Sequence, residues 1–223
     1  MLNMVIIMNN TATRVYIIRH GESVGNLHKI CLGHTNLDLT DLGHLQANKT
    51  FEELKNIEFR AIYSSDLIRA MNTARPHAAY RGMEIIPEPD FRELYFGLWE
   101  NASVEYLKDT YKEAFTVGWR QIFGDFTPPE GESVVHMADR MYSGLLKIAK
   151  KHAGEQILVT SHAAAIRALW GKISGRMPSE WGTAFPFPSN ASYSIVDIVD
   201  GEILPVAYSC DAHLAEYTTN IQH

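Results

Sequence analysis

Two arginines and two histidines stand just beyond short apolar runs of the chain, where side chains of these types could act together. Arg19 and His20 follow the first run, Arg69 follows the second and His162 follows the third. A guanidinium presents a planar fork of donors that matches the oxygens of an anion. An imidazole can serve as a nucleophile or as an acid and base. This set therefore indicates a cationic site for an anionic ligand, with histidine chemistry inside it.

The elements that would position these residues are strands alternating with helices. The apolar runs that we expect to form buried strands are Arg14–Ile18, Ala61–Tyr63 and Ile157–Thr160. The stretches that we expect to be helical are Asp41–Leu54, Asp66–Ala79 and Ser133–Lys150. Two late runs flank Asp200-Gly201, a dipeptide typical of a β-hairpin. The pattern predicts an α/β three-layer sandwich: a mainly parallel central sheet, helices on both faces, and at least one antiparallel strand near the C-terminus.

A parallel sheet would bring the four side chains to one place. In open α/β sheets, ligands bind beyond the carboxyl ends of the strands. Arg19, His20, Arg69 and His162 all follow strand ends, so we expect them at the same edge. Each strand is followed by an expected helix start, where free N–H groups and the macrodipole favour an anion.

The domain organisation is expected to be simple. We interpret residues 1–12 as a loose N-terminal leader and residues 13–223 as a single domain. Residues 95–130 are rich in aromatic side chains and end near Pro128-Pro129. This stretch fits a helical insertion or lid over the site, or a satellite hydrophobic cluster, and the two interpretations are compatible.

Composition narrows the class of protein. The 223 residues are 46% hydrophobic and 21% charged, which is normal for a globular chain that can bury a core. The formal net charge of -6 argues against nucleic acid as a partner, but clustered arginines can still bind a small phosphorylated metabolite. We interpret Cys31 and Cys210 as reduced and structural. No membrane span or signal segment is evident, so the expected location is the cytoplasm. The oligomeric state is left open.

The order of short motifs resembles the histidine phosphatase superfamily, also called phosphoglycerate mutase-like. The resemblance covers about Arg14 to Asn190. The motifs that carry it are Arg19-His20-Gly21-Glu22-Ser23 with Asn26, Gly33–Ala47, Ser64–Ala74, Arg92-Glu93-Leu94 followed by Gly97–Glu100, Gly131-Glu132-Ser133, and Val159–His162. The resemblance implies a phosphomonoester hydrolase that works through a phosphohistidine, with a small phosphorylated metabolite as its substrate and with no metal or other cofactor.

Two departures from the family pattern bear on this expectation. Ala163-Ala164 stands where the family often has Gly-Gly, and a requirement for positive φ there would distort the anion site. Mutase members usually carry adjacent arginines between the acid-bearing loop and the Gly-Glu-Ser motif, and here that interval holds a single arginine, Arg120. This weakens the mutase interpretation.

The resemblance and the chemistry together suggest roles for individual residues. His20 is expected to take the phosphoryl group in its neutral form, while Arg19 and Arg69 hold the phosphate oxygens and His162, if protonated in the complex, adds a third positive group. Glu93 is the expected general acid, with Glu88 and Glu100 as competitors. The expected phosphate or substrate contacts are Asn26, Ser23, Ala163 and Glu22, although Glu22 could instead orient an arginine. Structural roles are expected for Glu132 and Asn190.

Three rival interpretations remain. Within the enzyme class, the runner-up is a phosphoglycerate mutase. A non-catalytic phospho-ligand binding protein is the second, although such a protein would be expected to lose one of the core groups. The third is a serine hydrolase, because Gly21–Gly25 fits a Gly-x-Ser-x-Gly elbow, with Asp197 and His213 following in the right order. That elbow would leave the arginines and His162 unexplained.

Overall fold

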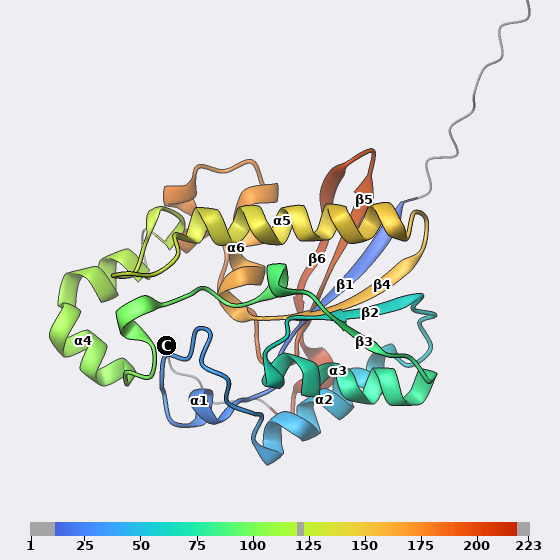
Figure 1. Cartoon of the computed structure of the whole chain (residues 1–223), viewed down its shortest axis with the longest axis horizontal. Helices are drawn as coiled ribbons and strands as arrows, with labels where there is room; N and C mark the ends of the chain where they lie inside the picture. Colours follow the sequence, from blue (N-terminus) through green and yellow to red (C-terminus); the bar gives the residue numbers. More distant parts are fainter. Residues whose placement is uncertain (1–11, 120–122, 218–223) are drawn as a thin grey trace, which may run out of the picture.

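The computed structural model describes residues 12–119 and 123–217, and these form an α/β sandwich around a six-stranded sheet (Figure 1). The strand order is β3-β2-β4-β1-β5-β6. The strands are β1 (Thr13–Arg19), β2 (Ala61–Ser64), β3 (Ile85–Pro87), β4 (Gln156–Ser161), β5 (Tyr193–Val199) and β6 (Glu202–Cys210). Strands β1 to β4 pair in parallel, whereas β5 pairs antiparallel with both β1 and β6. The predicted fold class is confirmed.

Helices connect the strands and cover both faces of the sheet. The α-helices are α1 (Val24–Leu27), α2 (Asp41–Leu54), α3 (Ile68–Arg81), α4 (Val104–Glu113), α5 (Val134–Lys151), α6 (Ala163–Ile173) and α7 (Trp181–Ala184). A π-helical turn, Ala114–Trp119, follows α4. Short 3₁₀ turns lie at Pro89–Phe91, Gly97–Trp99, Phe123–Asp125, Pro178–Glu180 and Ala212–Leu214.

The two layers of the core follow from the two-residue period of a strand. Val15 and Ile17 of β1 pack with residues of α5 and α6, while Tyr16 and Ile18 pack with residues of α2 and α3. Figure 1 shows α5 lying along one side of the sheet, with α2 and α3 on the other. A strand buried on both faces explains the unbroken apolar run Val15–Ile18 in the middle of β1.

Helix α5 shows most clearly how the sequence dictates local structure. Ser133 caps it by accepting a hydrogen bond from the backbone N–H of His136. The apolar side chains expected on one face, among them Met141, Leu145 and Ile148, are fully buried in the core.

Leu145→Ala is expected to lower the free energy of unfolding by about 2–5 kcal/mol, because it leaves a cavity that the packed core cannot fill. Lys150→Ala, on the exposed face of the same helix, is the control and should change it by less than about 0.5 kcal/mol. Urea unfolding followed by circular dichroism measures both. Equal losses in the two variants would show that burying Leu145 in the core does not stabilise the fold.

Two further expectations concern segments outside the sheet. Trp99, Phe115, Phe123 and Phe126 of the aromatic stretch belong to the same buried cluster as the sheet residues, so the stretch is not a separate satellite cluster. It contains α4 and several helical turns. That it opens and closes as a lid stays a prediction. The expected leader lies almost wholly outside the described residues.

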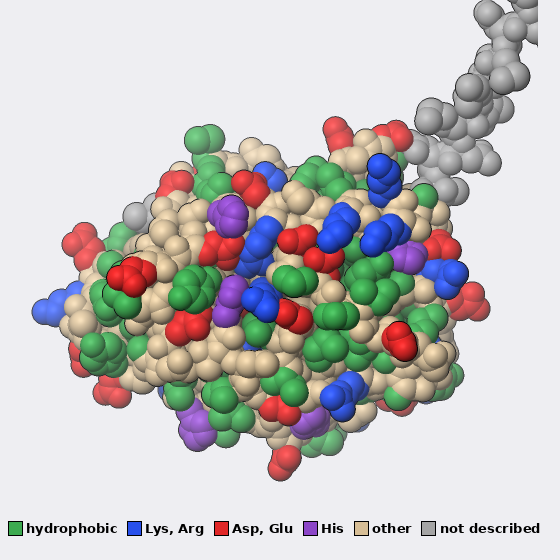
Figure 2. Space-filling model, viewed as in Figure 1, with side chains coloured by type: hydrophobic (Ala, Val, Ile, Leu, Met, Phe, Trp, Pro, Cys, Tyr) green, Lys and Arg blue, Asp and Glu red, His purple; other side chains and the backbone are tan. Residues whose placement is uncertain are grey.

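Three further findings concern membrane-spanning helices, the cysteines and the surface charge. In the described part of the chain, no helix is long and apolar enough to cross a membrane. Cys31 and Cys210 are unpaired, as predicted. On the face shown in Figure 2, acidic and basic side chains are interspersed rather than gathered into one field of positive charge.

Candidate active site

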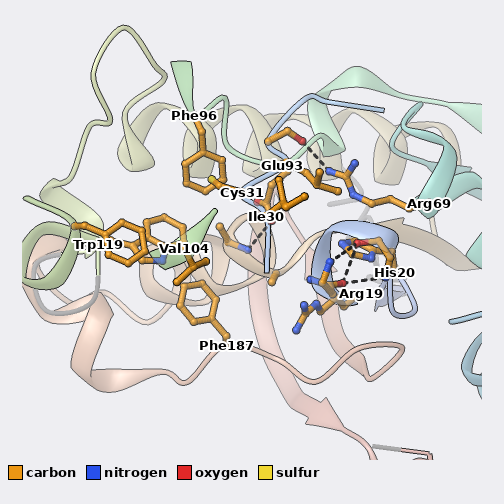
Figure 3. A pocket seen from close by; sticks show the side chains of 17 residues that line it. Arg19, His20, Ile30, Cys31, Arg69, Glu93, Phe96, Val104, Trp119 and Phe187 are labelled. Carbon is orange, nitrogen blue, oxygen red and sulfur yellow. Dashed lines mark hydrogen bonds between the residues drawn. The ribbon is translucent and has the colours of Figure 1, made fainter. Parts of the chain in front are cut away.

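A pocket lies beyond the carboxyl ends of β1, β2 and β4, at the edge predicted from the sequence. It is a cavity of about 160 Å³. Its lining residues are Arg19, His20, Ser23, Asn26, Ile30, Cys31, Leu32, Gly33, Arg69, Glu93, Phe96, Val104, Phe115, Trp119, Ala163, Ala164 and Phe187. Figure 3 shows the polar group of His20, Arg19 and Arg69 toward one end, with Trp119, Val104 and Phe187 toward the other.

His20 is held by its backbone and by one ring nitrogen. Its N–H donates to Ser161 O across the β1–β4 pair, and its carbonyl accepts from Asn190 Nδ2 at 3.1 Å. Its Nδ1 lies 2.7 Å from Gly21 O. A carbonyl oxygen can only accept, so Nδ1 carries the proton and Nε2 keeps its lone pair. Burial, with Arg69 and Arg19 adding to it, holds the pKa of His20 well below its usual range.

Gly21 allows the loop after β1 to pack directly on the start of α2. A Cβ on Gly21 would lie 2.4 Å from Gly43 O, so any side chain would push the loop away. The N–H of Gly21 donates to Thr73 Oγ1 at 3.0 Å, which ties the same loop to α3. The loop that carries His20 is therefore fixed from both sides.

The two arginines lie in the pocket with part of their donor capacity in use. Arg19 Nη1 donates to Pro188 O at 2.5 Å, and its Nε is buried with no partner among the described residues. Arg69, the second residue of α3, donates to Gly33 O and Thr35 O. Burial lowers the pKa of each guanidinium to about 10, so both keep their positive charge near neutral pH. An anionic ligand would offset the cost of burying these charges.

His162 stands beside His20 rather than among the lining residues. The two imidazole centroids are 5.2 Å apart, and His162 Nε2 lies 2.8 Å from Ser65 Oγ at the end of β2. Burial, then Arg69 and His20, holds the pKa of His162 well below its usual range. In the free protein His162 is therefore neutral, and the positive charge we expected on it requires a bound anion to stabilise it.

Glu93 is the predicted general acid that the structure places in the pocket. Its carboxylate sits at the N-terminus of α6, where Ala164 N donates to Oε2 and Ala165 N donates to Oε1, each at 3.2 Å. These N–H groups have no helical acceptor, so the carboxylate satisfies them. Ala163, the first residue of α6, also lines the pocket.

The two competing carboxylates have other partners and do not line the pocket. Glu88 forms an ion pair with Lys147 at 2.7 Å. Glu100 accepts from the backbone N–H of His34 at 2.7 Å and from the hydroxyl of Thr35. The geometry favours Glu93 over both.

Ser23 and Asn26 form one hydrogen-bonded unit at the start of α1. Ser23 caps α1 by accepting from Asn26 N, and Asn26 Oδ1 accepts from Ser23 and from Asn190 Nδ2. Because its oxygen is used in this way, Asn26 has its Nδ2 to offer a ligand. Asn190 bridges this unit to the carbonyl of His20, which gives it the structural role that we expected.

The structure shows which partner the carboxylate of Glu22 has and which backbone conformation Ala163-Ala164 adopts. Glu22 does not line the pocket, and its carboxylate accepts from Thr40 Oγ1 at 2.7 Å, which holds the start of α2. Among the described residues, no ion pair of Glu22 with an arginine is found, and its contact with substrate stays a prediction. Ala163 and Ala164 both have ordinary negative φ, so alanine does not distort the start of α6. Arg120 lies outside the described residues.

Arg140 was not predicted from the sequence, yet it fixes the loop that carries Glu93. Its guanidinium donates to the carbonyl oxygens of Asp90, Arg92 and Glu93, each at 2.8 Å. The carboxylate of Glu132 accepts from the same guanidinium through both oxygens, which explains the structural role of Glu132. The only sequence signal is the spacing of Glu132 and Arg140 across the start of α5.

Arg140→Gln is expected to lower kcat on alkyl phosphates by about 10- to 100-fold, because the loop that carries Glu93 loses three of its hydrogen bonds. The loss on p-nitrophenyl phosphate should be smaller, since that substrate needs less help from Glu93. Lys147→Gln, on the same helix but paired with Glu88, is the control. A uniform loss on both substrates would mean that Arg140 only stabilises the fold.

The serine-hydrolase interpretation is wrong. His213 Nε2 lies 3.0 Å from Thr50 Oγ1, and Asp197 is ion-paired with Arg14 at 2.8 Å. Neither contacts Ser23, whose hydroxyl is engaged with Asn26.

In the part of the chain that the structure describes, no group of three or more His, Cys, Asp or Glu side chains is arranged to hold a metal ion.

Comparison with known proteins agrees with this geometry. The model of the histidine phosphatase superfamily (branch 1) matches residues 15–211, and the chain belongs to this superfamily, as the motifs predicted. The uncharacterized phosphatase PhoE of Bacillus subtilis is 29% identical over 205 residues, which cover 92% of this chain and 98% of PhoE. A probable phosphoglycerate mutase, GpmB of Photorhabdus laumondii, is 34% identical over 73% of this chain and 75% of its own length.

Solved structures share the fold. YhfR of Bacillus stearothermophilus superposes with a TM-score of 0.85 at 24% identity, covering 91% of this chain and all of its own. A mycobacterial glucosyl-3-phosphoglycerate phosphatase complexed with VO3 superposes with a TM-score of 0.82 at 23% identity, covering 89% of this chain and all of its own. At these identities the likeness establishes the fold alone.

Proposed function

We propose that this protein hydrolyses small phosphate monoesters by transferring the phosphoryl group to Nε2 of His20 and then to water. The observation that carries the proposal is the hydrogen bond between His20 Nδ1 and Gly21 O, with both guanidinium groups in the same pocket. It fixes the tautomer in which Nε2 holds a lone pair. A depressed pKa keeps that lone pair available near neutral pH.

The charges of the pocket suit a phosphoryl dianion. Arg19 and Arg69 can each bind oxygens of the phosphoryl group, and the backbone N–H of Ala163 and Nδ2 of Asn26 can donate to them as well. Negative charge on the bound group favours a proton on His162, which then becomes a third cation. Positioning and charge stabilisation of this kind account for most of the catalysis of phosphoryl transfer. The proposal needs no metal ion.

Glu93 supplies the proton that the departing oxygen requires. Nε2 of His20 forms a bond to phosphorus as the ester P–O bond breaks, and Glu93 gives its proton to the leaving alkoxide. A water molecule then gives its proton to Glu93 as its oxygen attacks the phosphorus, and the N–P bond breaks to release phosphate. Glu93 is back in its starting state at the end of the cycle.

A phosphoglycerate mutase is the second candidate, supported by relatives of that name. A phosphoglycerate carries a carboxylate as well as a phosphate, and both need cationic partners. Among the described lining residues, the cations are Arg19 and Arg69, and both are needed for the phosphoryl group. The remainder of the described lining is mostly apolar, which favours the hydrolase.

The proposed function is tested by release of inorganic phosphate from p-nitrophenyl phosphate and from a panel of metabolite monoesters in excess chelator. We expect turnover to continue at an unchanged rate, because the cations that hold the phosphate are side chains. A loss of activity in chelator that one divalent ion restores would contradict the proposed arrangement of charges.

The same panel separates the two enzyme classes and the binding-protein alternative. A phosphatase releases phosphate without a bisphosphoglycerate primer, whereas a mutase interconverts phosphoglycerates only when primed. Absence of turnover together with tight phosphate binding would favour a non-catalytic protein.

A further inference from the structure

The end of the pocket away from His20 is lined almost entirely by apolar side chains. These are Ile30, Phe96, Val104, Phe115, Trp119 and Phe187, which we call the apolar wall. Figure 3 shows Trp119, Val104 and Phe187 together at this end, with Phe96 above them and Ile30 between them and the arginines. The polar groups of the lining gather instead around His20. A phosphate bound to the arginines therefore directs its ester oxygen and leaving group into an apolar space.

The wall is built mainly of aromatic rings packed on one another. The rings of Trp119 and Phe187 stack with centroids 5.4 Å apart and an interplanar angle of 30°. Phe96 meets Trp119 edge-on with centroids 5.0 Å apart. Phe115 is buried, whereas Trp119 and Phe187 keep part of their surface exposed. Such rings bind other rings by stacking or edge contacts in addition to apolar burial.

Arg167 fixes the ring of Phe187 before any ligand arrives. Its guanidinium carbon lies 4.1 Å from the centroid of the Phe187 ring and 4.5 Å from that of Phe123. Its Nε donates to Phe185 O at 2.7 Å, and a second nitrogen donates to Gly182 O. These contacts hold the segment that ends in Phe187 against α6. A wall ordered in advance loses less conformational entropy on binding.

We propose that the apolar wall is a leaving-group subsite for monoesters of uncharged, apolar alcohols, preferably ones that carry an aromatic ring. This rests on the proposed function, because it concerns the other half of the same substrate. A polyhydroxylated or carboxylated leaving group would lose its hydration against these side chains without finding hydrogen-bond partners. A ring-bearing group would instead cover the surface of Trp119 and Phe187 that stays exposed.

The test compares three alkyl monoesters: 3-phenylpropyl phosphate, n-propyl phosphate and glycerol 3-phosphate. The first two leave as primary alkoxides of similar basicity, so a difference between them reports binding of the ring rather than ease of departure. We expect kcat/KM for 3-phenylpropyl phosphate to exceed that for n-propyl phosphate by about 10- to 100-fold. Glycerol 3-phosphate should be no better than n-propyl phosphate.

Two variants assign the preference to the wall. Trp119→Ala and Phe187→Ala should each lower kcat/KM for 3-phenylpropyl phosphate by about 10-fold more than kcat/KM for n-propyl phosphate. Trp119→Phe should keep most of the advantage. Tyr106→Ala is the matched control, since Tyr106 is an exposed aromatic residue on α4 that does not line the pocket.

The outcomes separate the subsite from the proposed function. Equal kcat/KM for the three esters, or an advantage that survives both alanine variants, would overturn the subsite while leaving the hydrolase intact. No turnover of any ester by the unaltered protein would overturn the proposed function instead. Turnover of n-propyl phosphate in each variant shows that the variant is folded.

Discussion

His20→Ala is expected to lower turnover of every phosphomonoester by roughly 10⁴- to 10⁶-fold, because the variant has no atom that can take the phosphoryl group. Ser23→Ala should cost less than about 10-fold, since it removes a cap of the four-residue helix α1 but no reacting group. Steady-state phosphate release measures both. Tight binding of inorganic phosphate by His20→Ala would show that the arginines remain in place.

The reverse order of effects would contradict the account. If Ser23→Ala abolished turnover and His20→Ala kept a substantial fraction, the nucleophile would be Ser23 rather than His20. The hydrogen bonds between Ser23 and Asn26 make that outcome unexpected.

Glu93→Gln is expected to slow phosphorylation by about 10²- to 10⁴-fold on alkyl phosphates and by much less on p-nitrophenyl phosphate. An alkyl alkoxide is strongly basic and needs a proton as it leaves, whereas nitrophenolate can leave without one. The amide keeps the shape of Glu93 but has no such proton to give. Single-turnover phosphorylation should be measured on both substrates, so that attack of water does not limit the rate.

The hydrogen bonds that Glu93 accepts affect how the losses in Glu93→Gln are compared. Ala164 N donates to Oε2 of Glu93 and Ala165 N donates to Oε1, so the NH₂ of glutamine would face one of these donors in either orientation. Any resulting shift of the loop would affect both substrates equally. The ratio of the two losses therefore reports the proton, and equal losses would show that Glu93 is not the leaving-group acid.

The parts of the fold that depend on local pattern were predictable. The bounds of α2 agree with the expected helix, and the strands that carry the site differ from the expected runs by one or two residues. Strand β3 was missed, because it has three residues, ends in Pro87 and pairs at the edge of the sheet. A run that short carries no periodic signal.

The candidate site could likewise be predicted only in part. Arg19, His20, Arg69 and His162 lie where their positions after strand ends predicted, because parallel strands bring their carboxyl ends to one edge. Arg140 acts on Glu93 through backbone carbonyl oxygens, and any residue type can offer a carbonyl, so the sequence contains no partner to recognise.

Only part of the apolar wall could be predicted from the sequence. The aromatic stretch was singled out, and four of its side chains line the pocket: Phe96, Val104, Phe115 and Trp119. Ile30 and Phe187 come from segments far from it in the sequence, and their meeting depends on the tertiary fold. The charge of His162 could not be predicted either, because its pKa is lowered by burial.

The central claim is tested most directly by trapping the phosphorylated protein. The enzyme is mixed with p-nitrophenyl phosphate carrying a radiolabelled phosphoryl group, quenched in alkali within the first turnover and digested for mass spectrometry. The account predicts a label that survives alkali, is lost in acid and resides on the peptide containing His20. A label that survives acid, as a serine ester would, or no label during rapid hydrolysis, would contradict it.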